Sequence, residues 1–227
     1  MLLQCETDCA GAVGADPAAA WLRMETFESL IDLNEGCFEL LAEQARATPG
    51  QVLLGQVATL WAALDGGGRR RAASCLYVVL DGGFAQPLRW NAAVAAEVGD
   101  AGRLAPAPFF TVPAAARVGQ AVFTFAWHLA RCQGTAARLL LGVPAVGVQH
   151  LAQLTLRQVC ELAHAHPEWL QPRWPGRADV WRGLLQAAAQ GETRALERAR
   201  LRGQTLLAAE TRRAAGMPRP RTPLRPG

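Results

Sequence analysis

Apolar residues recur every three to four positions through the second half of the chain, and this periodicity restricts the fold more than any other feature. In the segment expected to run from 113 to 132, Val118, Val122, Phe125 and Leu129 follow the helical repeat. The periodic pattern is interrupted at Gly134, Gly142–Pro144, Thr155 and Pro167. The sequence therefore predicts short helices that are joined by tight turns.

The same reading of the whole chain predicts an all-α protein, a helical bundle of about nine helices. The expected helical segments are 27–48, 51–64, 87–98, 113–132, 135–141, 144–153, 155–166, 180–190 and 192–215, and 69–75 could form a further short helix. Thr155 and Asp179 are expected to cap the helices that follow them, because their side chains can accept a free backbone N–H. The triplet 66–68 is all glycine and predicts a break. The run 76–80 is rich in β-forming residues but has no visible partner strand, so we expect helix or extended packing there rather than a sheet.

The two halves of the chain resemble each other. Val52-Leu-Leu-Gly55 matches Leu139-Leu-Leu-Gly142, and a Leu-Ala pair precedes both; Pro87-Leu-Arg-Trp90 matches Pro172-Arg-Trp174. A duplication would give two like units that pack as a pseudo-dimer; a shared helical pattern is the alternative. The expected organisation is a flexible tail (1–16), helical repeat unit 1 (17–98), a linker (99–112), helical repeat unit 2 (113–190), a basic C-terminal helix (191–216) and a disordered Arg/Pro tail (217–227).

Positive charge is concentrated at the C-terminal end. All 23 basic residues are arginine; residues 1–172 carry a net charge of −4 and residues 173–227 a net charge of +8. Such an end attracts nucleic acid, acidic proteins or anionic lipid, although a solvated charged face would have the same composition. The candidate contacts for a nucleic acid or a protein partner are Arg194, Arg198, Arg202, Arg212 and Arg213. The end from about Glu192 is expected to bind such a partner and to be unnecessary for folding.

Several classes of function lack support in the sequence. No apolar run is long enough to cross a bilayer, and we expect a cytoplasmic protein. No signature of a hydrolase, a phosphate-binding loop or a zinc protease is present, so we predict no enzyme, cofactor, catalytic residue or small-molecule substrate. Cys160 and His164 share one helix face, but their spacing matches no zinc pattern, and we predict no metal site.

Five residues are expected in the core or at an interface, because they are large, apolar and periodic: Phe123, Trp127, Leu129, Leu151 and Leu154. The segment 139–163 also has the outline of a helix-turn-helix, in which Arg157 and Gln158 would reach DNA bases. Ordinary helix packing is the competing interpretation of that segment. Trp169, Trp174 and Trp181 are expected to close the edge of a core, with base stacking as the alternative.

The repeat unit resembles FlhD, a subunit of the bacterial flagellar master regulator. The similarity is carried by Leu129-Ala, by Ala137-Arg-Leu-Leu-Leu-Gly and above all by the run from Leu154 to Ala163. In the first half it is carried by Ile31-Asp-Leu-Asn and Leu40-Leu-Ala-Glu-Gln. The resemblance implies an all-helical regulatory protein that works with a protein partner, either an FlhC-like subunit or a second copy, in controlling transcription of flagellar or secretion genes. Unlike FlhD, this chain carries its own basic end.

Overall fold

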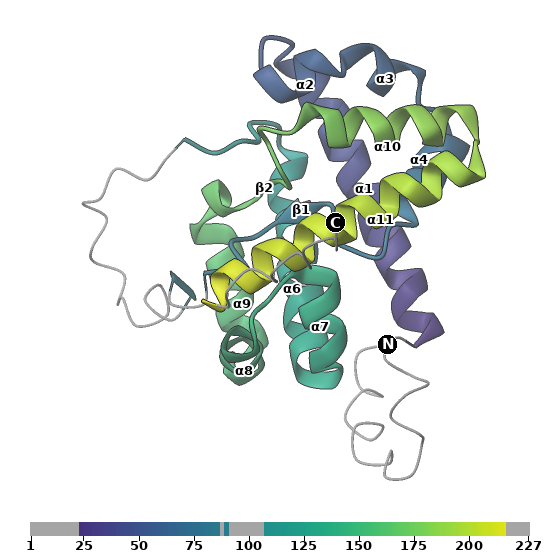
Figure 1. Cartoon of the computed structure of the whole chain (residues 1–227). Coiled ribbons are helices and arrows are strands. Elements are labelled where there is room, and N and C mark those ends of the chain that lie inside the picture. Colours follow the sequence, from purple (N-terminus) through teal and green to yellow (C-terminus); the bar gives the residue numbers. More distant parts are fainter. Residues whose placement is uncertain (1–22, 87–88, 91–106, 217–227) are drawn as a thin grey trace, which may run out of the picture.

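The chain folds into a bundle of helices, and the predicted all-α class is confirmed (Figure 1). The computed structural model describes residues 23–86, 89–90 and 107–216. The tails 1–16 and 217–227, nearly all of the expected helix 87–98 and the first part of the linker lie outside them. The described elements are α1 (Met24–Ala47), α2 (Val52–Gln56), α3 (Ala58–Ala63), α4 (Gly66–Ala73), β1 (Leu80–Asp81), α6 (Ala114–Cys132), α7 (Gly134–Leu141), α8 (Ala145–Gln153), α9 (Leu156–Ala165), the 3-10 helix η2 (Pro167–Trp169), β2 (Gln171–Pro172), α10 (Ala178–Gln190) and α11 (Thr193–Ala214).

The first helices of the two repeat units, α1 and α6, pack against each other, and other helices surround them. α4 packs on α1, while α8 and α9 pack on α6. A cluster of three aromatic rings shows that the core continues between the halves: Phe38 of α1, Trp61 of α3 and Trp181 of α10 lie with ring centroids 5.9–6.2 Å apart. The last helix of the expected unit 113–190 therefore packs against the first half.

A two-residue antiparallel strand pair joins the halves, although no sheet was expected from the run 76–80. β1 pairs with β2, and the backbone N–H of Arg173 donates to the carbonyl oxygen of Val79 at 3.0 Å. The expectation of helix or unpaired extended chain was wrong at this point because the partner strand comes from the opposite half of the chain. Local sequence carries no signal for such a pairing.

The expected single helix 51–64 is two short helices that meet at Val57. There the backbone leaves helical geometry (φ −126°, ψ 17°), and the Val57 N–H bonds Leu54 rather than the residue four positions earlier. The preceding turn is tightly packed, because a Cβ on Gly55 would lie 2.8 Å from the carbonyl oxygen of Pro49. The amphipathic pattern thus identified the helical segment but not its break.

Side-chain capping explains where two of the described helices, α4 and α9, begin. Thr155 caps α9 as predicted, with a reciprocal capping box in which its hydroxyl accepts from the Gln158 N–H at 3.2 Å. The glycine triplet 66–68 was expected to interrupt helical structure, but it forms the first turn of α4, which begins at Gly66. Asp65 caps this helix by accepting a hydrogen bond from the Gly68 N–H at 2.6 Å. The predicted cap at Asp179 is wrong: Asp179 lies inside α10, and its carboxylate pairs with arginines.

The order of elements is the same in the two halves. In each half a long α-helix is followed by three short α-helices and then by a two-residue strand, and in the second half the 3-10 helix η2 comes before the strand. Where Val52-Leu-Leu aligns with Leu139-Leu-Leu, the first residue is exposed (74% and 52%) and the next two are buried in both segments. The Pro-Trp part of the match lies differently, because Pro172 belongs to β2 whereas Pro87 comes after β1.

Helix α11 is part of the folded body rather than a dispensable extension of it. It forms an antiparallel pair with α10 after the left-handed Gly191 (φ 69°), and it buries Leu196 and Leu207. Figure 1 shows α11 running across the molecule in front of α1 and α6. The expectation that the end from Glu192 is unnecessary for folding therefore fails for 193–214, because this segment contributes to the common core.

At the closest approach of α11 to the core, replacing a helix glycine with alanine is expected to destabilise the fold, whereas the same replacement normally stabilises a helix. A Cβ on Gly203 would lie 2.3 Å from the Tyr77 hydroxyl oxygen, whereas a Cβ on Gly183 of α10 meets nothing within 4 Å. Gly203→Ala should lower the free energy of unfolding by about 1–3 kcal/mol through overpacking. Gly183→Ala should raise it by up to about 1 kcal/mol through helix propensity. Chemical denaturation of both variants tests this, and a stabilised Gly203→Ala would show that Tyr77 can move away at little cost.

Candidate functional site

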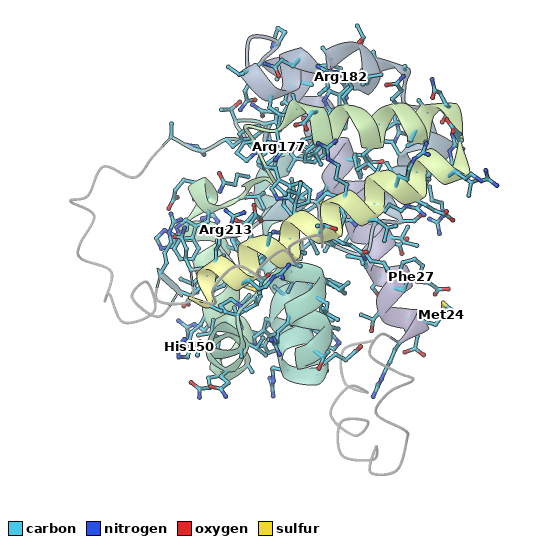
Figure 2. All side chains as sticks on the ribbon, in the orientation of Figure 1. Met24, Phe27, His150, Arg177, Arg182 and Arg213 are labelled. Carbon is cyan, nitrogen blue, oxygen red and sulfur yellow. The ribbon has the colours of Figure 1, made fainter. Side chains whose placement is uncertain are left out.

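The arginines predicted as contacts all lie on the outer surface of α11. We define the arginine surface as Arg194, Arg198, Arg202, Arg212 and Arg213, each of which is exposed. The helix holds them there because Leu196 and Leu207 on its opposite side are buried. α11 contains six arginines and two glutamates, so its charge is strongly positive. Figure 2 shows Arg213 near the C-terminal end of this helix.

One member of the arginine surface is already engaged. Arg202 forms an ion pair with Asp179 of α10, which also accepts two hydrogen bonds from Arg177 at 3.0 and 3.1 Å. The hydrogen bond from Arg177 contributes most to lowering the pKa of the Asp179 carboxyl to about 2, so the carboxylate stays ionised at neutral pH. The stripe formed by Arg194, Arg198 and Arg202 is therefore uneven, and Arg202 is the least available of the three.

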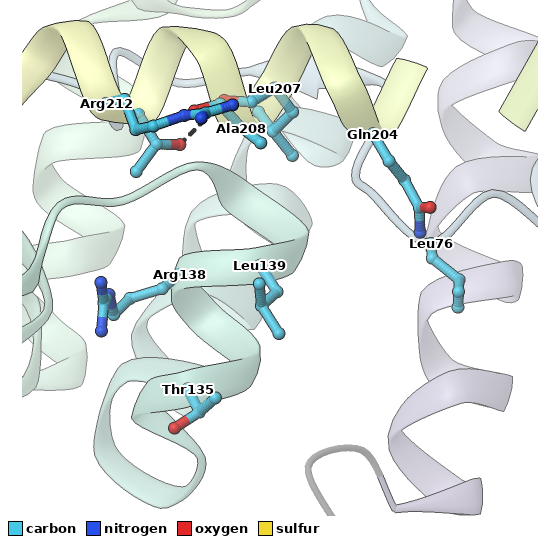
Figure 3. A pocket seen from close by; sticks show the side chains of 9 residues that line it. Leu76, Thr135, Arg138, Leu139, Gln204, Leu207, Ala208 and Arg212 are labelled. Carbon is cyan, nitrogen blue, oxygen red and sulfur yellow. Dashed lines mark hydrogen bonds between the residues drawn. The ribbon is translucent and has the colours of Figure 1, made fainter. Parts of the chain in front are cut away.

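A cleft of about 490 Å³ lies between α7 and α11, next to the arginine surface (Figure 3). We call it the α7–α11 cleft. Its lining residues come from α7, from α11 and from the loop after α4: Leu76, Thr135, Arg138, Leu139, Gln204, Leu207, Ala208, Thr211 and Arg212. Two of them are arginines and none is acidic.

Close packing between the end of α7 and α11 fixes the position of this cleft. Gly142 ends α7 in the left-handed region (φ 73°), and a Cβ there would lie 2.6 Å from Leu207 Cδ1 and 3.1 Å from Thr211 Oγ1. Only glycine fits both the backbone angle and this approach. The helices diverge beyond this point, and Leu139 remains 52% exposed.

Arg173 lies buried beneath α11 and connects the segments that pack there. Nothing in the sequence separated it from the exposed arginines. Arg173 is 4% exposed; its Nε donates to the Val78 carbonyl oxygen at 2.5 Å and its Nη2 to that of Leu141 at 2.7 Å. Its Nη1 lies 3.9 Å from the Asp81 carboxylate. Burial lowers the pKa of the guanidinium, while Asp81 opposes that change. The bonded carbonyls and the nearby carboxylate mark Arg173 as a structural link between β1, α7 and β2.

A second, smaller cavity of about 300 Å³ opens beside Arg173. Asp81, Glu210 and Arg213 contribute charged groups to its lining. Burial raises the pKa of the Glu210 carboxyl, and the nearby Arg173 opposes that shift. Because charges of both signs line this cavity, it offers less charge selectivity than the α7–α11 cleft.

The residues expected to read DNA from a helix-turn-helix are engaged in local contacts. Arg157 Nε donates to Glu161 Oε1 at 2.7 Å. The side chain of Gln158 closes the capping box with Thr155 by accepting the Thr155 N–H at 2.9 Å. Base readout would require both side chains to exchange these bonds for new ones, so the structure favours the interpretation as ordinary helix packing.

Four of the five residues expected in the core are buried: Phe123, Leu129, Leu151 and Leu154. Trp127 differs, since it is only half-buried. Its indole N–H donates to the Leu154 carbonyl oxygen at 2.7 Å, and the Arg131 guanidinium lies 5.0 Å from the ring centroid. Trp127 therefore holds the turn between α8 and α9. Three further tryptophans are buried as expected: Trp169, Trp174 and Trp181.

The cysteines and histidines of the described residues do not gather into a group large enough to hold a metal ion, although Cys132 Sγ lies 4.0 Å from His128 Nδ1. In the described part of the chain, no group of three or more His, Cys, Asp and Glu side chains could hold a metal ion. Cys160 accepts a hydrogen bond from Gln120 Nε2 at 3.5 Å, while His164 is exposed. Burial raises the pKa of the Cys75 thiol to about 11, which keeps this thiol protonated and unreactive at neutral pH.

None of the described helices combines the length and the apolar character that a bilayer crossing would require. No protein-family description, curated protein or solved structure matches the chain.

Proposed function

We propose that this chain is a non-enzymatic, cytoplasmic bacterial regulatory protein that acts through protein–protein interaction. In this proposal an FlhD-like helical core presents the arginine surface of α11 to an acidic partner, either an FlhC-like subunit or a second copy, in the regulation of flagellar or secretion genes. The observation that carries the proposal is the arginine surface itself, with Arg194, Arg198, Arg212 and Arg213 exposed on a helix that the core holds in place.

The repeated order of helices supports the FlhD-like part of the proposal. A long helix followed by three short ones occurs twice, and the matched segments 52–54 and 139–141 have the same pattern of burial. The strands that follow each set pair with one another in antiparallel fashion. Two like units related by a pseudo-two-fold axis would bring corresponding segments together in this way.

Direct DNA binding is the second candidate function. Guanidinium groups match phosphate geometry, and exposed arginines along one helix can follow a nucleic acid backbone. Because Arg157 and Gln158 are engaged locally, this binding would depend on phosphate contacts of the arginine surface rather than on base readout.

Charge reversal on α11 tests both candidates. Arg194→Glu with Arg198→Glu should abolish retention of polyglutamate, the probe for an acidic protein, at about 50 mM salt. If DNA is the partner, the same pair should abolish retention of duplex DNA in a gel shift. Arg182→Glu on α10 is the matched control, because Arg182 is also exposed but does not belong to the arginine surface. Failure of the wild-type chain to retain either probe at low salt would overturn the proposal.

A further inference from the structure

The α7–α11 cleft combines an apolar floor with positive charge. Leu76, Leu139 and Leu207 provide apolar surface, and Arg138 and Arg212 provide charge without any acidic residue in the lining. In Figure 3 both arginines lie toward one end of the cleft, while Leu76 lies at the other end. A ligand that fits this lining must itself be apolar and must carry negative charge.

The apolar surface extends along α11 beyond the cleft. Leu201 is 60% exposed, and Leu201, Gln204, Ala208 and Arg212 are spaced by three, four and four positions. Residues at this spacing share one side of a helix. Arg198 lies three positions before Leu201 on the same helix. This strip, Arg198, Leu201, Gln204, Ala208 and Arg212, therefore has two apolar residues and one uncharged polar residue between an arginine at each end.

We propose that the α7–α11 cleft seats an acidic amphipathic helix of a partner protein. This inference rests on the proposed function, since it names the kind of partner that the arginine surface would attract. The part of the strip from Leu201 to Arg212 is about 17 Å long at 1.5 Å per residue, which is about three turns of a partner helix. Leucine-type side chains of that helix enter between Leu139 and Leu207, as in other helix-in-groove complexes.

Charge complementarity selects the chemistry of the partner. Arg138 and Arg212 meet carboxylates near one end of the seated helix, and Arg198 meets carboxylates near the other. Exposed arginine–carboxylate pairs contribute little free energy each, so they orient the partner and speed its approach. Burial of Leu139 against the partner supplies most of the affinity.

A labelled synthetic peptide tests the proposal on the full chain. The probe is a helix of about 18 residues with leucines at positions i, i+3, i+4 and i+7 and glutamates elsewhere, followed by fluorescence anisotropy. A second peptide of the same composition has its leucines distributed around the helix. The wild-type chain should bind the first peptide at least about tenfold more tightly than the second.

Matched substitutions locate the site. Leu139→Asp should weaken binding at least about tenfold, because it places a negative charge, which repels the acidic peptide, in the apolar floor of the cleft. Val146→Asp on α8 is its control, since Val146 is equally exposed at 55%, and it should leave the affinity unchanged. Arg138→Glu with Arg212→Glu should also weaken binding, with Arg182→Glu as the control. Circular dichroism of each variant verifies that the helices are retained.

Two outcomes would overturn the inference while leaving the proposed function in place. In the first, both peptides bind equally well and Leu139→Asp has no effect while Arg194→Glu with Arg198→Glu abolishes binding, so that charge alone matters. In the second, sedimentation shows that the wild-type chain is a dimer and Leu139→Asp makes it a monomer, so that the cleft seats a second copy. If neither peptide nor polyglutamate nor DNA is retained at low salt, the proposed function fails together with the inference.

Discussion

Arg173→Ala should lower the free energy of unfolding by about 3–5 kcal/mol, the usual cost of removing one partner from a buried charged network. The guanidinium bonds the carbonyl oxygens of Val78 and Leu141, and both carbonyls would lose a buried donor. Leu141 is the last residue of α7, where a positive charge also stabilises the helix dipole. Urea denaturation followed by circular dichroism measures the loss.

Two further variants separate the hydrogen bonds of Arg173 from its charge and its bulk. Arg173→Lys keeps the charge but cannot reach both carbonyls from one ammonium group, so most of the loss should remain. Arg177→Ala removes an exposed arginine only four residues away and should leave the stability nearly unchanged. If Arg173→Lys were as stable as the wild type, the charge rather than the two-carbonyl geometry would be what holds this region together.

Asn34→Ala should cost about 3 kcal/mol or more, since it leaves several buried polar groups without partners. Asn34 is fully buried in α1. Its side-chain amide donates to the carbonyl oxygens of Ala73 at 3.0 Å and Tyr77 at 2.9 Å, and it accepts from the Val79 N–H at 3.1 Å. These bonds hold the segment after α4 against α1. A thermal melt should show a large decrease in the melting temperature, whereas Ser29→Ala, at an exposed site on the same helix, should melt like the wild type.

Asn34→Asp adds a pH-dependent version of the same test. The introduced carboxyl group would face two carbonyl oxygens in a buried site, so its pKa in the folded state should rise above the value of about 3.9 in the unfolded chain. The buried carboxyl is least destabilising while it is protonated in both states, below about pH 4. The variant then loses stability as the pH rises through the folded-state pKa. Denaturation curves from pH 3 to about pH 7 should show this trend, and a pH-independent variant would place position 34 in contact with water.

The candidate site was only partly visible in the sequence. Composition located the arginine surface, because clustering of charge along the chain needs no structure to be seen. The α7–α11 cleft was not visible, since Leu139 and Leu207 belong to separate helices and become neighbours only when α11 packs on the end of α7. The role of Arg173 was equally hidden, because a buried arginine and a solvated one have the same letter in a sequence.

The sequence by itself determined the helical class, most helix boundaries and the cap at Thr155, because these depend on interactions between residues only a few positions apart. The tertiary structure decided the pairing of β1 with β2, the packing of α10 on the first half and the burial of one side of α11. It also turned Asp179 from an expected cap into an ion-pair partner of Arg202. Each of these features joins residues far apart in the chain, and their energy comes from burial and charge pairing that no local pattern encodes.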